Sequence, residues 1–293
     1  MNKRKFLNFL EFEKRYSAHT ISAYGLEIDC FLSFLTAEGV TFEEVDYRVV
    51  RHYLTVMKEN GRQASSINRS ISSLRTFYKF LMREGIVGSN PMRLVHALKT
   101  PRKLPVVVEQ EKMVDLLTLG VGDPENFEEA RDFIILELLF GTGIRLSELL
   151  VMQERDIDTY NKRILIFGKR GKERLVPVHQ TLLKEIRRYL MLKYAQDFKN
   201  KSTYLIVTKD GKQAYPSLIY RTVHRYLGRI TSQQKKSPHV LRHTFATALL
   251  NNGADLNAIK ELLGHAGLAA TQVYTHNSVE RLKSIYKQAH PKA

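Results

Sequence analysis

The amino-acid sequence predicts a mainly α-helical protein with one small β-hairpin, an α+β fold divided into two domains. Apolar residues recur at three- and four-residue spacing over most of the chain, which is typical of amphipathic helices. One stretch, "NKRILIFGKRGKERLVPVH", alternates apolar and polar residues on both sides of a glycine-containing turn, which is typical of a hairpin. Another, "KTPRKLPVVV" at 99–108, has two prolines and little helical pattern, and it is the best candidate for a linker between the domains.

The first domain, residues 1–98, is expected to be a helical bundle. One helix follows Ser17 and stops at Gly39, and a second fits 49–59. A third lies in "ASSINRSISSLRTFYKFLMREG", where one face is apolar and the other is polar. That polar face can donate hydrogen bonds to phosphate oxygens, although an ordinary solvated helix face has the same composition. Its basic residues, which are candidate DNA contacts, are Arg69, Arg75 and Lys79.

The second domain, residues 109–293, is expected to combine helices with the hairpin. An apolar helix over 133–140 should end at Gly141 and Gly143, and a later helix should start at Pro238. Asp255 and Gly264 are plausible caps of the helix between them. The remaining expected elements are hairpin strands at 164–167 and 174–178, a short strand at 204–207, and helices near 181–194 and 217–230.

The charge of the chain favours a nucleic-acid partner. The 293 residues carry 46 Lys and Arg against 30 Asp and Glu, a net charge of +16. Residues 160–245 hold 20 of the basic residues and only four acidic ones, so the whole excess is concentrated there. A solvated charge run is the alternative, but such runs usually mix both signs.

Several other classes are excluded or disfavoured. No apolar stretch approaches the roughly 20 residues that span a bilayer, and the amino terminus does not resemble a signal peptide, so no membrane partner is expected and the cytoplasm is the expected setting. The single cysteine, Cys30, excludes an internal disulfide and a cysteine-based metal site. No cluster of carboxylates indicates a metal pair, and no loop of the GxxxxGK type indicates nucleotide binding, so no cofactor is expected.

Two arginines and a histidine have the placement of an anion site. In "FGTGIRLSELL", Arg145 lies at the start of a helix directly after a tight glycine turn. In "SPHVLRHTFATALLNNG", His239 and Arg242 are three residues apart and so face the same way within one helical turn. His243 can join them or can be a satisfied structural histidine, and the sequence favours the structural interpretation.

The stretch "LLGHAGLAATQVYTH" adds His265, just past a helix end, and Tyr274 on the segment that follows. Together with a hairpin lysine, these residues suit the metal-independent attack of a phenol on a phosphodiester. Arginines would neutralise the phosphoryl oxygens, and the lysine would protonate the departing sugar oxygen. The histidines would either assist proton removal from the phenol or donate hydrogen bonds to the phosphoryl oxygens. A tyrosyl phosphate ester keeps much of the energy of the broken bond, so rejoining would need no ATP.

With these motifs in this order, the chain resembles the tyrosine recombinases, and among them the bacterial Xer subgroup that resolves chromosome dimers. The resemblance runs through "GTGIRLSELL", "GKRGKERLVPVH", "SPHVLRHTFATALL" and "LLGHAGLAATQVYTH". It implies a 3′-phosphotyrosyl intermediate with Tyr274 as the nucleophile. Lys172 is chemically equivalent to Lys169, so the choice between them rests on the spacing in the family; Arg170 and Lys172 are further candidate DNA contacts. The implied catalytic residues are Arg145, Lys169, His239, Arg242, His265 and Tyr274.

The resemblance also implies an architecture and partners. A helical core-binding domain (1–98), a linker (99–108) and a catalytic domain (109–293) would clamp duplex DNA, and the terminal helix would dock on a neighbouring protomer. The expected partners are a double-stranded recombination site and a tetrameric synapse of one recombinase or of two paralogues, and a DNA translocase is a candidate activator. The alternatives are a mobile-element integrase, a type IB topoisomerase, a catalytically silent DNA-binding protein, and a phosphatase or ribonuclease.

Overall fold

The computed structural model describes residues 2–101, 106–118, 126–168, 172–199, 202–264 and 276–290, with the side chains of 276–282 excepted. It divides into two compact units, Met1–Lys103 and Leu104–Ala293, and each is described by itself. The predicted fold class is confirmed, because helices dominate the described residues and the strands form one small sheet.

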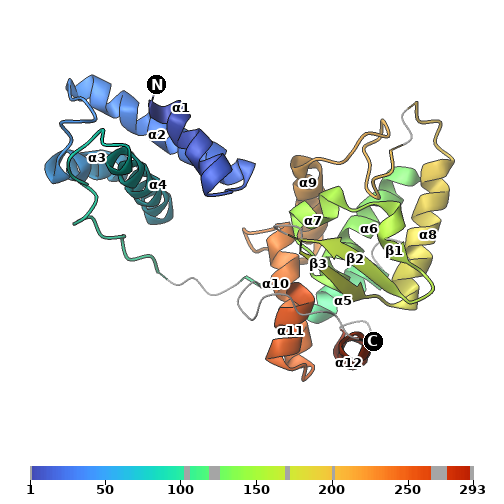
Figure 1. Ribbon diagram of the computed structural model, residues 1–293. Coiled ribbons are helices and arrows are strands. Elements are labelled where there is room, and N and C mark those ends of the chain that lie inside the picture. Colours follow the sequence, from blue (N-terminus) through green and yellow to red (C-terminus); the bar gives the residue numbers. More distant parts are fainter. Residues whose placement is uncertain are drawn as a thin grey trace. The chain divides into compact units, whose positions relative to one another are not determined.

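The amino-terminal unit is a bundle of helices (Figure 1). The Ser17 side chain accepts a hydrogen bond from the Thr20 N–H, and Gly39 ends the same helix at φ +68°, so both predicted ends are confirmed. The elements are α1 (Asn2–Asn8), a short π-helical stretch η1 (Phe9–Glu13), α2 (Ala18–Glu38), α3 (Tyr47–Glu59) and α4 (Ala64–Arg83).

The apolar face of α4 is the centre of this unit. Leu74 and Tyr78 are fully buried, and the rings of Phe6 and Phe77 meet edge to face with centroids 5.1 Å apart. The polar face fastens the chain that follows the bundle: the Asn68 side-chain amide pairs with both the N–H and the carbonyl of Leu98, at 2.7 and 2.9 Å. Part of the predicted polar face of α4 therefore holds the segment that follows the bundle.

The carboxy-terminal unit contains the helices and the hairpin predicted for the second domain. Its helices are α5 (Gln110–Thr118), α6 (Phe127–Thr142), α7 (Leu146–Val151), α8 (Gln180–Tyr194), α9 (Pro216–Ile230), α10 (Pro238–Asn251), α11 (Leu256–Leu263) and α12 (His276–Ala289). A 3₁₀ turn, η2 (Glu154–Asp156), precedes the strands β1 (Ile157–Asp158), β2 (Arg163–Phe167) and β3 (Glu173–Pro177).

The buried helix α6 organises this unit. It packs between α8 and α10 and also contacts α5, α7 and α9 (Figure 1). The sheet is antiparallel in the order β1-β2-β3, with Ile164 opposite Val176 and Ile166 opposite Arg174. Ile164, Ile166 and Val176 join the same core as α6, so the hairpin is anchored by its inward face.

Two sequence predictions differ from the structure. The helix expected over 133–140 begins at Phe127, because the Asn126 side chain accepts a hydrogen bond from the Glu129 N–H and starts the helix earlier. The strand expected at 204–207 is wrong: Tyr204 and Val207 form only isolated bridges, to Gln153 and Gln213. Each pairing is a single bridge that does not extend into a ladder.

The terminal helix α12 packs on its own chain. The Tyr286 hydroxyl donates to the carbonyl of Gly141 at 2.7 Å, and the Asn252 side chain donates to the carbonyl of Ala289 at 3.0 Å. Tyr286 is 3% exposed, so this side of α12 is covered by α10, α11, β3 and the end of α6. None of the helices in the described part of the chain is long and apolar enough to cross a membrane.

Candidate active site

The glycine turn after α6 places Arg145. Gly143 ends α6 at φ +61°, a conformation that favours glycine, and an added Cβ would lie 2.8 Å from the Leu263 side chain. The chain then turns into α7, with Arg145 as the residue that precedes its first turn. The Arg145 N–H donates to the Glu148 carboxylate at 2.8 Å, which closes the amino terminus of α7.

Glu148 is a buried carboxylate shared by two arginines. Arg145 donates to its Oε1 at 2.8 Å, while Arg174 on β3 donates to Oε1 and Oε2 at 2.9 and 2.8 Å. Burial alone would raise the pKa of Glu148, but the hydrogen bonds and charge of Arg174, together with the hydrogen bonds from Arg145, outweigh it, so the pKa lies below its usual value. Glu148 is therefore ionised near neutral pH and holds both guanidinium groups.

Arg242 lies in the second turn of α10 and is only 6% exposed. It donates to the carbonyl of Gly143 at 2.5 Å and to the carbonyl of Leu263 at 2.7 Å. Burial, with the positive charges of Arg145 and Arg174, lowers the pKa of Arg242 to about 10. The side chain still carries its charge near neutral pH.

Three arginines bind three successive carbonyls at the carboxyl end of α11. Arg174 Nε donates to Leu262, Arg242 Nη2 to Leu263 and Arg145 Nη2 to Gly264, at 2.9, 2.7 and 3.1 Å. The last carbonyls of a helix carry partial negative charge, which attracts the guanidinium groups. Three positive charges and one carboxylate thus meet at this point, and the excess of positive charge suits a phosphodiester.

His239 is exposed on the first turn of α10, one turn before Arg242. Its Nε2 lies 3.0 Å from Nε2 of His243, so one ring donates the hydrogen bond and the other accepts it. The sequence favoured a structural interpretation of His243, whereas the structure pairs it directly with His239.

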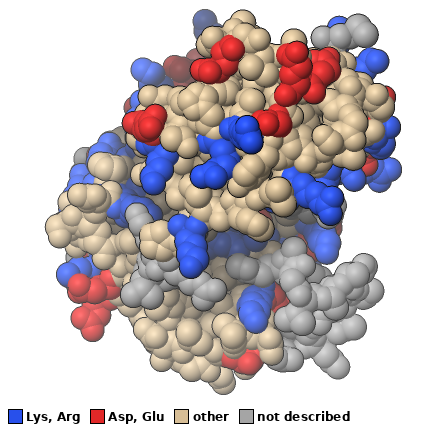
Figure 2. Space-filling model, turned by 90° about the vertical axis from the view of Figure 1, so that its left-hand side faces the viewer, with Lys and Arg blue, Asp and Glu red and all other residues tan. Residues whose placement is uncertain are grey.

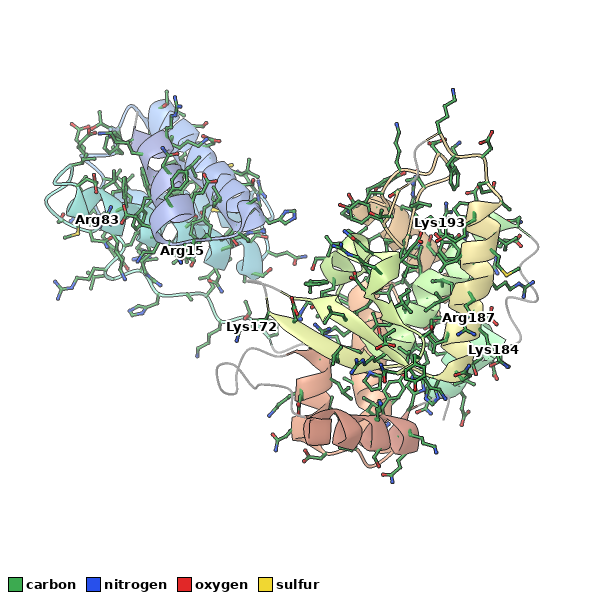
Figure 3. The ribbon with its side chains drawn as sticks, turned by 45° about the vertical axis from the view of Figure 1, so that its right-hand side comes forward. Arg15, Arg83, Lys172, Lys184, Arg187 and Lys193 are labelled. Carbon is green, nitrogen blue, oxygen red and sulfur yellow. The ribbon has the colours of Figure 1, made fainter. Side chains whose placement is uncertain are left out.

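The structure thus brings Arg145 and Arg242 together and places His239 on the helix of Arg242. The other predicted residues, Lys169, His265 and Tyr274, lie outside the described residues, as does Arg170. Lys172 is described: it stands exposed at the free end of the β2–β3 hairpin (Figure 3), where its carbonyl accepts from the Gly168 N–H at 2.6 Å.

The predicted DNA contacts on α4 differ in their availability. Lys79 is exposed, and Arg69 is 56% exposed with Glu27 at 3.5 Å. Arg75 is half-buried, and its Nη2 donates to the carbonyl of Val95 at 2.6 Å, so it fastens the chain after the bundle as well. Figure 2 shows Lys and Arg side chains spread more widely than Asp and Glu over the face turned to the viewer.

Glu148 and Arg174 are members of this cluster that the sequence analysis did not single out. Each has a signal in the sequence. Glu148 is the third residue of α7, where an acidic side chain caps the helix start. Arg174 lies in phase with Val176 on the inward face of β3, and a charged residue there requires a buried partner.

Stability should depend on pH through Glu148. Because its folded pKa lies below the ordinary value of 4.5, its contribution is fully present above about pH 4.5 and is lost as the pH falls through the folded pKa. We expect Glu148→Gln to be less stable near pH 7 by about 1.5–3 kcal/mol, the value of a hydrogen bond to a charged group. The variant should also lose less stability than the wild type on acidification to about pH 3.

Urea unfolding followed by far-UV circular dichroism measures this effect, since the chain has no tryptophan. Asp158→Asn is the comparison variant. Hydrogen bonds from Asn161 and Arg163 lower the pKa of Asp158 as well, but Asp158 and Arg163 are each 32% exposed, so solvent screens the pair and a smaller effect on stability is expected. A Glu148→Gln variant with the same loss of stability on acidification as the wild type would contradict the prediction.

Two family models match the chain. Residues 108–281 match the phage integrase family, and residues 4–85 match the phage integrase N-terminal SAM-like domain. The first match contains all six predicted catalytic residues and the Glu148–Arg174 pair. The second contains the α4 residues Arg69, Arg75 and Lys79.

Similar proteins were found among both characterised sequences and solved structures. "Tyrosine recombinase XerC" of Listeria innocua is 39% identical over 99% of this chain and 98% of its own, and the protein of that name from Bacillus pumilus is 38% identical over 98% and 95%. The XerH recombinase bound to a palindromic difH substrate superposes with a TM-score of 0.73 and 21% identity, covering 96% of this chain and 83% of that one.

Proposed function

Because this chain belongs to the phage integrase family and is a site-specific tyrosine recombinase of the Xer type, we propose that it resolves chromosome dimers by cutting and rejoining duplex DNA with Tyr274 as the nucleophile. The proposal rests chiefly on the convergence of Arg145 and Arg242 on the carboxyl end of α11. That helix end leads directly into the segment with His265 and Tyr274.

In the proposed reaction, Arg145 and Arg242 bind the nonbridging oxygens of the scissile phosphate. The Tyr274 hydroxyl attacks phosphorus while His239 and His265 assist the loss of its proton or hold the phosphoryl oxygens. The bond to the 5′ oxygen breaks, and Lys169 supplies the proton to that oxygen. The product is a 3′-phosphotyrosyl ester, which the 5′ hydroxyl of a second strand attacks to restore the phosphodiester and free the tyrosine.

The proposal extends to the domains and partners. Residues 1–98 would bind the recombination site through Arg69 and Lys79, and residues 109–293 would carry out the chemistry, with 99–108 as the linker. The active assembly would be a tetramer on DNA, of this chain alone or with a paralogue, in the cytoplasm. Helix α12 would then detach from the rest of its own protomer, where the Tyr286 hydroxyl donates to the Gly141 carbonyl, and dock on the next protomer.

Nicked suicide duplexes test this function. The duplexes are candidate dimer-resolution sites, with a nick near the cleavage point so that a short fragment diffuses away and the covalent complex accumulates. We expect an adduct on denaturing gels in which the protein is joined to a 3′ phosphate. Tight binding without an adduct on any candidate site would reject autonomous cleavage and favour a partner-dependent recombinase or a silent DNA-binding protein. Relaxation of plasmids that lack such a site would favour the topoisomerase alternative.

A further inference from the structure

We propose that Arg174 is a positioning residue for DNA cleavage: it orients Arg145 through Glu148 and fixes the point at which the chain leaves α11. The proposal rests on the proposed function, because its role is defined by the phosphodiester cleavage assigned to this site. Arg174 is not itself expected to touch DNA.

The contacts of Arg174 fix the plane of its guanidinium group. Its Nη1 and Nη2 form a two-pronged pair with the carboxylate of Glu148, and its Nε donates to the carbonyl of Leu262. All three nitrogens therefore have a partner, and the side chain is only 6% exposed. The side chain of Arg145, by contrast, is 40% exposed, so it is open to a phosphate.

Through the pair with Glu148, Arg174 also restricts the orientation of Arg145. Oε1 of Glu148 accepts from both arginines, and Oε2 accepts from Arg174 and from the backbone N–H of Arg145. Because Arg174 holds both oxygens, it sets the rotation of the carboxylate that receives Arg145. A less constrained carboxylate would let the Arg145 guanidinium turn away from the position needed in the transition state.

Arg174 also lies against the two chain segments that lead to the other predicted catalytic residues. An added Cβ on Gly264, at φ +65°, would lie 3.1 Å from Arg174 Cδ, so the arginine occupies the space left by the missing side chain just before His265. An added Cβ on Gly168, just before Lys169, would lie 3.9 Å from Arg174 Nη1. The buried Arg174 side chain thus lies beside the residues that precede Lys169 and His265, and it is linked to Arg145 through Glu148.

The geometry requires arginine at this position. A lysine retains the positive charge beside Glu148, but its single ammonium group cannot form the two-pronged pair and reach the Leu262 carbonyl in the same plane. Arg174→Lys therefore removes orientation while keeping charge. Arg174→Met removes both and leaves Glu148 with Arg145 as its remaining arginine partner.

The test compares these variants with Arg163→Met, which removes an arginine from the neighbouring strand β2, where Asp158 is its partner at 2.9 Å. Single-turnover adduct formation is measured on suicide duplexes at saturating DNA, together with duplex affinity and melting temperature. We expect Arg174→Lys to cleave about 10- to 100-fold more slowly, the range for a misplaced catalytic group, with duplex affinity within about twofold of the wild type. Arg174→Met should be slower still, and Arg163→Met should cleave at the wild-type rate.

A double-mutant cycle separates positioning from folding. If Arg174 acts through Arg145, Arg174→Lys should slow an Arg145→Gln protein much less than it slows the wild type. Equal factors in the two backgrounds, or a lower melting temperature with an unchanged cleavage rate, would overturn the proposal.

Amide hydrogen exchange tests the positioning role even if the wild type forms no adduct. Absence of the adduct would count against the proposed function alone. Faster exchange at the Arg145 amide, which donates to Glu148, is expected in Arg174→Lys and not in Arg163→Met. Unchanged exchange at that amide would overturn the positioning role.

Discussion

Replacing Tyr274 with phenylalanine is expected to abolish covalent attachment to DNA. The change removes only the phenolic hydroxyl, so the phosphate still binds but no nucleophile is available to attack it. Loss of a nucleophile costs many orders of magnitude, and we expect adduct formation on a suicide duplex to fall by at least about 10⁴-fold. Duplex affinity at fixed salt concentration should be unchanged, because the positive charges that bind phosphates all remain.

Tyr160→Phe is the matched control, since Tyr160 is 92% exposed in the same unit and has no proposed part in the reaction. It should form the adduct at the wild-type rate. An adduct that persists in Tyr274→Phe would assign the nucleophile to another residue, and peptide mapping of the DNA-linked fragment would identify it.

Replacing Arg145 with glutamine is expected to slow cleavage by about 10²- to 10³-fold, the usual cost of removing one preorganised donor to a transition-state oxygen. The fold should tolerate the change, because Glu148 keeps its two-pronged pair with Arg174. Single-turnover adduct formation at saturating DNA measures the effect, and the melting temperature serves as the check on folding.

A methylphosphonate at the scissile position tests why Arg145 is needed. This linkage replaces one charged nonbridging oxygen with a neutral methyl group, so an arginine that acts by neutralising that oxygen is no longer needed. On this substrate we expect the ratio of the wild-type cleavage rate to the Arg145→Gln cleavage rate to be smaller by at least about tenfold. The same ratio of rates on both substrates would argue that Arg145 does not act by neutralising this oxygen.

Local signals in the sequence were sufficient for several elements of the site. Asp255 caps the start of α11 with hydrogen bonds to two backbone N–H groups, and Gly264 ends it at φ +65°. Each cap is a contact between residues a few positions apart, and so it can be predicted from residue type and spacing. The placement of Arg145 before α7, directly after the Gly143 turn, was predicted on the same basis.

Contacts between distant segments could not be predicted in this way. The segment at 204–207 has the composition of a strand, but a strand also needs a neighbour of matching length, and here Gln153 and Gln213 supply single bridges. Arg75 was predicted as a DNA contact from its position on the polar face, and the sequence did not predict that its side chain also donates to the Val95 carbonyl. Periodicity predicts which face of a helix is polar, and it does not predict what the polar side chains bind.

The sequence by itself determined the fold class, the family and the candidate residues of the reaction, because these depend on local periodicity and on motifs within short stretches of chain. Only the tertiary structure decided how the arginines are held. Glu148 and Arg174 are 26 positions apart, and Arg174 reaches Leu262 over 88. A buried charge needs a partner, and folding decides which distant group that partner is, here through the packing of α7 against β2 and of α11 against β3.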